Sequence, residues 1–486
     1  PAQIAGQSTY AFRHDLVREA AYAMLTDRDR ELGHRLAAEW SSAAGVTDSA
    51  VLAEHFARGG VPERAVDGFL RAARDALEGN DMAAVLARVE RGLACGARGD
   101  ALGELLVLRA EAHRWRADYT ASIEAAQLAM AVLSPGSRGW CVAATQTIVA
   151  HSAMADHEAL EDTLARISAS PPLDPIERVR ALARGCVNLY LAGRYDRADA
   201  LLDRLEGEVA RAGLRDEPLA MARVLEARAF CEGARAEQGR ALALLEQVLG
   251  EHERAGDLRS ACLARNNLGY TFAQLGAYGR AAELLETTLR DAERMGQPFI
   301  SVLAQQNLGV VLGALGQHER AVELLQASIT HFEKQEDTHM AAVSRAYMAI
   351  ERLRTDDATS AARDAQLAAD TLTHTPPSHA LALAVQAHAH LATGNVAEAL
   401  AAARRAYEIL ESLGGLDEGE MLVRLGLAAA LEASGHADEA RAVASVGAAR
   451  LQTLAGKLPE ALRADYLEQV AENAALRRLA ERLVLH

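Results

Sequence analysis

Small, apolar and polar positions recur in a fixed pattern along most of the chain. Residues 266–281 align with residues 306–321, an offset of 40, and share Asn-Leu-Gly, then Leu-Gly, then Arg-Ala. Such self-similarity at a fixed period is the signature of a repeat architecture. The same frame places a small residue at one recurring position, mostly 38 to 43 residues apart, with a weaker match at Leu160: Ala65, Ser122, Ala198, Ala241, Ala281, Ala321, Ala361, Ala399 and Ala440.

Each repeat predicts two helices joined by a tight turn. The first helix ends at a glycine such as Gly193 or Gly394, because glycine readily adopts the left-handed backbone that closes a helix. Small residues at the repeated positions are expected to let the two helices approach closely, pairing Gly269 with Ala281 and Gly309 with Ala321.

The second helix of each repeat carries an apolar stripe that one hairpin cannot bury. Its large apolar residues lie three and four positions apart, which is the spacing of one helix face: Leu284, Leu285, Leu289, Leu324, Leu325 and Ile329. Prolines are expected where one hairpin ends and the next begins: Pro135, Pro171, Pro172, Pro175, Pro218, Pro298, Pro376 and Pro377. Because stacking on neighbours is then obligatory, the sequence predicts an all-α fold, an α-solenoid of about ten hairpins.

These motifs resemble the tetratricopeptide repeat (TPR). The matching features are Leu-Gly in the first helix, Gly-x-Tyr at the turn in residues 193–195 and 276–278, and Ala three residues later. The resemblance covers residues 45–455, is strongest over 262–330, and lacks the usual tryptophan of the first helix. It implies a right-handed superhelix with a concave face that binds peptides. A period near 40 exceeds the common period of about 34 and implies longer helices or linkers.

The two ends of the chain do not follow the repeat. Residues 1–44 contain Phe12-x-His14-x-Leu16-x-Arg18-Glu19-Ala-Ala-Tyr22, which resembles the junction after the ATPase or winged-helix module of large bacterial signalling ATPases of the STAND or AAA type. Residues 458–473 resemble the usual tail of the same proteins, which often carry a serine/threonine kinase, and residues 456–486 are expected to form a C-terminal capping helix. The resemblance implies that this chain is a fragment of such a protein, with the upstream module as a partner. An ordinary amphipathic capping helix is the alternative for the N-terminal stretch.

Composition narrows the function. The formal charge of −16 argues against a nucleic-acid surface, since such surfaces neutralise phosphates. Five cysteines without a C-x-x-C pair are typical of reduced cytoplasmic thiols rather than of disulfides or zinc sites. No apolar run is long enough to span a membrane, and no phosphate-binding glycine loop is present. We therefore expect a cytoplasmic, non-enzymatic region with no cofactor, no metal, and no membrane or nucleic-acid partner. The oligomeric state is left open.

Two asparagines are the informative polar residues. Asn267 and Asn307 stand at equivalent positions of successive first helices, and an amide offers both a donor and an acceptor to an extended peptide backbone. Resemblance to peptide-receptor repeats implies that role, whereas pairing with carbonyl groups across the helix stack is the alternative. Tyr347 takes the next equivalent position, so the ladder ends after two rungs. Other groove residues are expected beside them, although the last two could be merely solvated charges: Asn266, Tyr270, Gln306, Val310, Arg223 and Glu226.

The sequence therefore predicts a protein- or peptide-recognition sensor or scaffold region of a bacterial signal-transduction ATPase, with the ligand in the concave groove. A free-standing peptide receptor, or the TPR part of a transcription regulator, is the alternative. An enzyme or a helical protein of another kind is a third possibility.

Overall fold

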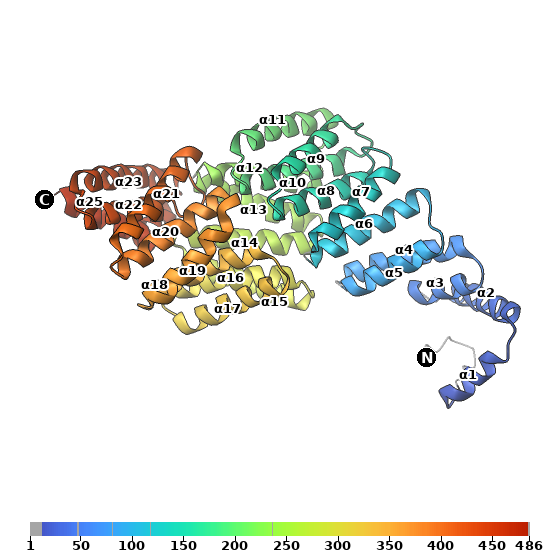
Figure 1. The fold of residues 1–486 in the computed structure, drawn as a ribbon. Coiled ribbons are helices and arrows are strands. Elements are labelled where there is room, and N and C mark those ends of the chain that lie inside the picture. Colours follow the sequence, from blue (N-terminus) through green and yellow to red (C-terminus); the bar gives the residue numbers. More distant parts are fainter. Residues whose placement is uncertain (1–11, 46–47, 80, 117, 236, 485–486) are drawn as a thin grey trace. The chain divides into compact units, whose positions relative to one another are not determined.

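A computed structural model describes residues 12–45, 48–79, 81–116, 118–235 and 237–484. Within these ranges the chain forms 25 α-helices and one short 3-10 helix, η1, and no strand (Figure 1). Alanine and leucine favour helices intrinsically, and the recurring apolar stripes hold the helices together. The prediction of an all-α solenoid is confirmed.

The chain divides into two compact units, Pro1–Thr147 and Ile148–His486. The first unit contains α1 (Asp15–Ala23), α2 (Asp27–Ala43), α3 (Ser49–Arg58), α4 (Pro62–Glu78), α5 (Met82–Ala94), α6 (Gly99–Trp115) and α7 (Tyr119–Val132). The boundary falls inside α8 (Arg138–Ala153).

The second unit contains the longer run of repeats. Its helices are α9 (His157–Ala169), α10 (Pro175–Leu191), α11 (Tyr195–Ala212), α12 (Pro218–Ala234), α13 (Gln238–Arg254), α14 (Leu258–Gln274), α15 (Tyr278–Arg294), α16 (Pro298–Ala314), α17 (His318–Lys334), α18 (Thr338–Arg354), α19 (Ala358–Thr371), η1 (Leu372–His374), α20 (Pro376–Ala392), α21 (Val396–Leu413), α22 (Glu420–Ala433), α23 (Ala437–Lys457), α24 (Glu460–Glu468) and α25 (Ala471–Val484).

The recurring small residue has one structural place. It is the fourth residue of the second helix in each repeat, as Ala281 is in α15 and Ala321 in α17. All ten residues of the frame, including Ser122 and the weaker match Leu160, are at most 3% exposed. The sequence period is therefore the spacing from one second helix to the next, and the first turn of each second helix is buried against the helix before it.

The glycines at the turns have the backbone conformation that the sequence predicted. Gly193 and Gly394 have φ of 71° and 80°, the left-handed backbone that closes the first helix. The predicted close approach of paired helices is also present. A Cβ added to Gly309 would lie 2.9 Å from Leu325 Cγ and 3.2 Å from the backbone oxygen of Ala321, the expected partner.

Four of the eight prolines expected between hairpins begin helices rather than only separating them. Pro175, Pro218, Pro298 and Pro376 are the first residues of α10, α12, α16 and α20. Proline suits this position because the backbone N–H that it lacks would have no partner inside the helix. These prolines thus mark the starts of first helices.

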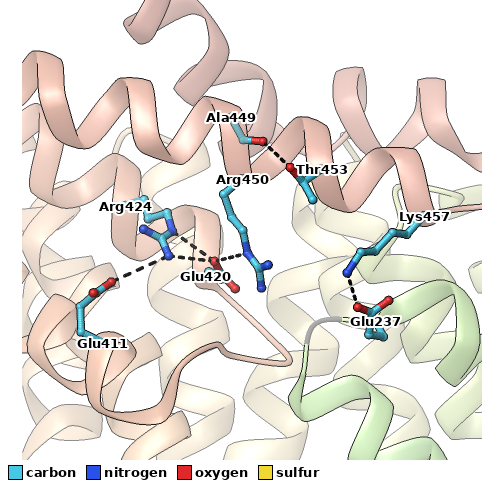
Figure 2. Close-up of polar contacts among 8 residues, drawn as sticks. All are labelled: Glu237, Glu411, Glu420, Arg424, Ala449, Arg450, Thr453 and Lys457. Atoms are coloured by element: carbon cyan, nitrogen blue, oxygen red, sulfur yellow. Dashed lines mark hydrogen bonds and ion pairs between the residues drawn. The ribbon is translucent and has the colours of Figure 1, made fainter.

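Late repeats of the second unit meet its middle repeats. The Lys457 ammonium of α23 forms an ion pair with Glu237 at the start of α13, as Figure 2 shows. The turn at Gly276 abuts α24, since a Cβ there would lie 2.6 Å from the carbonyl oxygen of Asp465. The end of α23 therefore meets the start of α13, although the two helices are far apart in the sequence.

The roles predicted for the two ends of the chain remain predictions. Residues 1–11 of the junction segment lie outside the described residues. At the other end, Leu458–Pro459 stops α23, and two helices, α24 and α25, follow in place of a single capping helix. No helix in the described part of the chain combines the length and hydropathy needed to cross a membrane.

Candidate ligand-binding site

The second unit encloses a cavity of about 400 Å³ between first helices, called here the amide cavity. Helix α14 contacts α16, and α16 contacts α18, so equivalent positions of successive repeats meet along one wall. Six of the eight predicted groove residues line this cavity: Glu226, Asn266, Asn267, Tyr270, Gln306 and Asn307.

The asparagines pair with one another. Asn307 Nδ2 donates to Asn266 Oδ1 at 3.2 Å, and Asn266 Nδ2 donates to Asn267 Oδ1 at 3.3 Å. Neighbouring Gln306 accepts a hydrogen bond from Ser344 Oγ at 2.5 Å. The amides thus bond across adjacent first helices through side chains, not through the carbonyl groups of the stack. Within the described ranges, Asn267 Nδ2 and Asn307 Oδ1 are left without a hydrogen bond, one as donor and one as acceptor.

Arg223 and Glu226 form a buried pair. Arg223 Nη1 donates to Glu226 Oε2 at 2.8 Å, and Nη2 donates to Ser260 Oγ at 3.1 Å. Glu226 is only 5% exposed. Burial is the largest influence on this carboxyl and opposes its ionisation. The nearby positive groups, Arg223 foremost and then Arg184, together outweigh burial and hold the pKa of Glu226 below its ordinary value. The interpretation of these residues as solvated charges is wrong, because α12 turns both into the packed interior.

A loop that the sequence analysis missed lies against the same cavity. Residues 414–419, the acidic loop, join α21 to α22. The backbone oxygen of Asp417 accepts hydrogen bonds from Gln238 Nε2 at 2.7 Å and from Gln274 Nε2 at 3.2 Å. A Cβ on Gly419 would lie 2.8 Å from Leu381 Cδ1. Side chains from three distant repeats therefore fix the position of this loop.

Tyrosines bring Glu418 of the acidic loop into the site. Tyr347 OH donates to Glu418 Oε2 at 2.9 Å, and the hydroxyl of Tyr270 lies 3.3 Å from that of Tyr347. Burial raises the pKa of Glu418 to about 7, with the neighbouring Asp417 charge acting in the same direction and the tyrosine hydrogen bonds opposing it. Burial likewise raises the pKa of Asp417. The next rung after the two asparagines is thus a tyrosine that holds a carboxyl group.

Beyond the acidic loop lies a second, smaller hollow of about 150 Å³, called here the acidic chamber. Val310, the seventh predicted residue, lines this chamber rather than the amide cavity, while Arg223 lines neither. Tyr270, Tyr347, Asp417 and Glu418 line both hollows. The acidic loop therefore separates two spaces of different chemistry.

Glu420, at the start of α22, lines the acidic chamber, and Figure 2 shows its polar contacts. Its Oε1 accepts from Arg424 Nη2 at 3.0 Å and from Arg450 Nε at 3.2 Å. Its Oε2 is buried and has no hydrogen-bond partner among the residues that the structure describes. The side chain is thus fixed in place while one oxygen is left for another donor.

Only a weak sequence signal pointed to the acidic loop. Gly414-Gly415-Leu-Asp417-Glu418-Gly419 is the one connection with three glycines around two acids. It occurs once, so the repeat frame gives it no equivalent. Geometrically, the site can hold an extended or compact ligand through amide hydrogen bonds, apolar contacts and carboxylates. A cavity of this size is within the range of ligand pockets.

No family model and no curated protein sequence matches the chain. Among solved structures, the chain is similar to a Rap protein complexed with competence and sporulation factor, at 13% identity, over 71% of this chain and 98% of that one, with a TM-score of 0.49. It is similar to NprR in complex with its cognate peptide NprX, at 11% identity, over 70% and 97%, with a TM-score of 0.48. It is also similar to a STAND protein with a tetratricopeptide repeat sensor from Pyrococcus horikoshii, at 15% identity, over 86% and 68%, with a TM-score of 0.46.

Proposed function

We propose that the second unit recognises a peptide segment, free or part of a protein, in the amide cavity. The observation that carries this proposal is the pair of open amide atoms on adjacent first helices, Asn267 Nδ2 on α14 and Asn307 Oδ1 on α16. Each residue of an extended peptide offers one carbonyl acceptor and one N–H donor. The site thus presents the complementary donor and acceptor, in a cavity of about 400 Å³.

The hydrogen-bond network supports this assignment of roles. Asn266 is 3% exposed and has both its amide atoms engaged with its neighbours, so it orients the other two asparagines. Asn267 and Asn307 keep the open atoms. Cavity walls of Phe230, Phe299 and Leu303 give side chains of the ligand an apolar surface, and hydrophobic burial supplies most of the binding free energy in such pockets.

A binding screen tests the proposal. Fluorescein-labelled, N-acetylated five-residue peptides are titrated with the purified chain and followed by fluorescence polarisation. For the peptides that bind, the double variant Asn267→Ala plus Asn307→Ala is expected to weaken binding roughly 10- to 100-fold, because two hydrogen bonds of about 1 kcal/mol each are lost.

The control is Asn395→Ala, an exposed asparagine at the turn before α21, which is expected to bind like the unmodified chain. Circular dichroism verifies that both variants are folded. Unchanged peptide affinity in the double variant, or no bound peptide at all, contradicts the proposal.

In its parent protein, we propose that this region is the sensor or scaffold of a bacterial signal-transduction ATPase linked to a serine/threonine kinase. The junction motif of residues 12–22 supports this, as does the exposure of its apolar side chains. Phe12 is 59%, Leu16 79% and Met24 86% exposed, and α1 buries no residue. An exposed apolar surface of this kind is typical of an interaction site.

The full reading frame tests this second part. A G-x-x-x-x-G-K-[ST] loop and kinase motifs upstream would agree with it. A DNA-binding helix pair instead would favour the transcription regulator, and neither motif would favour a free-standing peptide receptor. For a full chain with the ATPase, ATP hydrolysis is expected to change when a cavity-binding peptide is added.

A further inference from the structure

The acidic chamber has an excess of carboxyl groups. Asp417, Glu418 and Glu472 form no ion pair within the described residues, whereas Glu420 is held by Arg424 and Arg450. Four carboxyl side chains line it, set against a single guanidinium, Arg354: Asp417, Glu418, Glu420 and Glu472. That guanidinium is already engaged, because Arg354 Nη1 lies 3.2 Å from Glu351 Oε2. Burying a carboxylate without a cation is costly, so this arrangement requires an explanation.

The acidic loop is rigid enough to be a binding element. Gln238 and Gln274 hold its backbone at Asp417, and Gly419 is wedged against Leu381. Glu418 is oriented by the hydroxyl of Tyr347 at 2.9 Å. The carboxyl groups are thus fixed by the fold and do not swing freely into solvent.

Glu420 provides an independent indication. It is 5% exposed, two arginines hold its Oε1, and its Oε2 is buried with no hydrogen-bond partner in the described residues. Neither Asp417 nor Glu418 forms an ion pair within the described ranges. Buried acceptors of this kind are normally satisfied, and here the missing donor is best supplied from outside.

Aromatic rings complete the lining. Tyr278 and Tyr466 face the acidic chamber, and Tyr270 and Tyr347 lie between the two hollows. Tyrosine faces attract ammonium and guanidinium groups, and carboxylates give these cations strong charge-assisted hydrogen bonds. Carboxylates beside aromatic rings therefore favour an organic cation.

We infer that the acidic chamber receives an ammonium or guanidinium group, with Glu418 and Asp417 as its carboxylate partners at the entrance and Glu420 deeper in the chamber. The inference rests on the proposed function, because the rest of the ligand occupies the neighbouring amide cavity. The cation has two possible sources. It is the side chain of an arginine or lysine in the bound peptide, or it is a small free polyamine beside the peptide.

The test compares charged and neutral versions of the same peptide. Five-residue peptides, N-acetylated and C-amidated, carry arginine at each position in turn, and matched peptides carry citrulline, the neutral isostere. Affinities are measured by isothermal titration calorimetry, with agmatine and putrescine as separate small-cation probes. For at least one position, arginine is expected to bind about tenfold or more tighter than citrulline, a difference of about 1.4 kcal/mol.

Variants assign that preference to the chamber. Glu418→Gln keeps an acceptor for Tyr347 but removes the charge, and the ratio of arginine to citrulline affinity is expected to fall below about threefold. Glu472→Gln provides a second variant on another helix, so that the test does not depend on one substitution folding correctly. The control Glu439→Gln alters an exposed glutamate paired with Arg404 and is expected to leave the ratio unchanged.

The outcomes separate the two proposals. Peptides that bind and respond to the asparagine variants, but show no arginine preference at any position, would overturn the inference and leave the proposed function standing. Agmatine or putrescine binding that is lost in Glu418→Gln, with no bound peptide, would support the cation site and overturn the peptide proposal. Arginine preference without binding of small cations identifies the peptide side chain as the source. If neither peptides nor small cations bind, both proposals fail.

Discussion

The two hollows of the second unit, the amide cavity and the acidic chamber, differ in whether their buried polar groups have partners. In the amide cavity the charged and most amide groups are matched, since Glu226 pairs with Arg223 and Asn266 links its two neighbours. In the acidic chamber, within the described part of the chain, Glu418 is hydrogen-bonded by a tyrosine hydroxyl without a paired cation, and Glu420 Oε2 has no hydrogen-bond partner. Matched polarity stabilises the folded chain by itself, whereas unmatched polarity leaves binding energy to be gained from a ligand. The contrast can be tested by removing members of each set.

The largest effect is expected from breaking the matched pair. Glu226→Ala leaves the Arg223 guanidinium buried without its carboxylate, which costs about 3–5 kcal/mol in comparable cases. The free energy of unfolding, measured by urea denaturation with circular dichroism, should fall by that amount. The exposed pair Arg404–Glu439 is the control, and Glu439→Ala should cost less than about 1 kcal/mol. If both variants lose the same free energy of unfolding, the buried ion pair stabilises the fold no more than the surface ion pair does.

Removing the unpaired charge of Glu418 should instead raise the free energy of unfolding. The folded-state pKa of Glu418 is about 7, above its ordinary value of 4.5, so its protonated form is favoured by folding. That contribution is fully present below about pH 4.5 and is lost as the pH rises through 7. Glu418→Gln stays neutral throughout and should be more stable than the unmodified chain above about pH 8, by at most about 3 kcal/mol.

Thermal unfolding of Glu418→Gln and the unmodified chain across this pH range checks the prediction. The two curves should converge at low pH. A variant that is less stable at alkaline pH would mean that Glu418 carries a stabilising charge, and that the two hollows do not differ as described.

A smaller effect is expected at the wall that the two hollows share. Helix α16 presents Asn307 to the amide cavity and Val310 to the acidic chamber, and Gly309 lies between them. Gly309→Ala places a methyl group 2.9 Å from Leu325 Cγ and should destabilise by about 1–3 kcal/mol, as overpacking does. Gly279→Ala, in a helix with open space at that position, is the control and should cause no loss. Differential scanning calorimetry compares them.

The smallest effect on stability is expected at the asparagines. Asn307→Ala removes one side-chain hydrogen bond, to Asn266, and should lower the free energy of unfolding by about 1 kcal/mol. The same substitution should clearly lower the affinity for the peptides that bind. A stability loss of several kcal/mol with unchanged peptide binding would assign Asn307 to the helix stack alone. Urea denaturation and fluorescence polarisation on the same sample distinguish these results.

Features that recur could be predicted from the sequence, and features that occur once could not. Ala281 and Ala321 share a frame, so their burial and the helix that follows could be foreseen, and Asn267 and Asn307 were found by the same equivalence. The acidic loop has no second copy. Its position depends on contacts with Gln238 and Gln274, which are more than 140 residues away along the chain. Such contacts arise only once the repeats curve far enough to meet, and no local pattern encodes that curvature.

The ion pair between Lys457 and Glu237 has a consequence for how this unit comes apart. An open row of repeats can fray from either end, one hairpin at a time, because each repeat touches only its neighbours. Here the late helices are attached to the middle of the row, so loss of the last three helices would also expose the start of α13 and the turn after α14. The second unit should therefore unfold in a single concerted step. Under mechanical force, its force–extension curve should show one high force peak instead of a series of small ones.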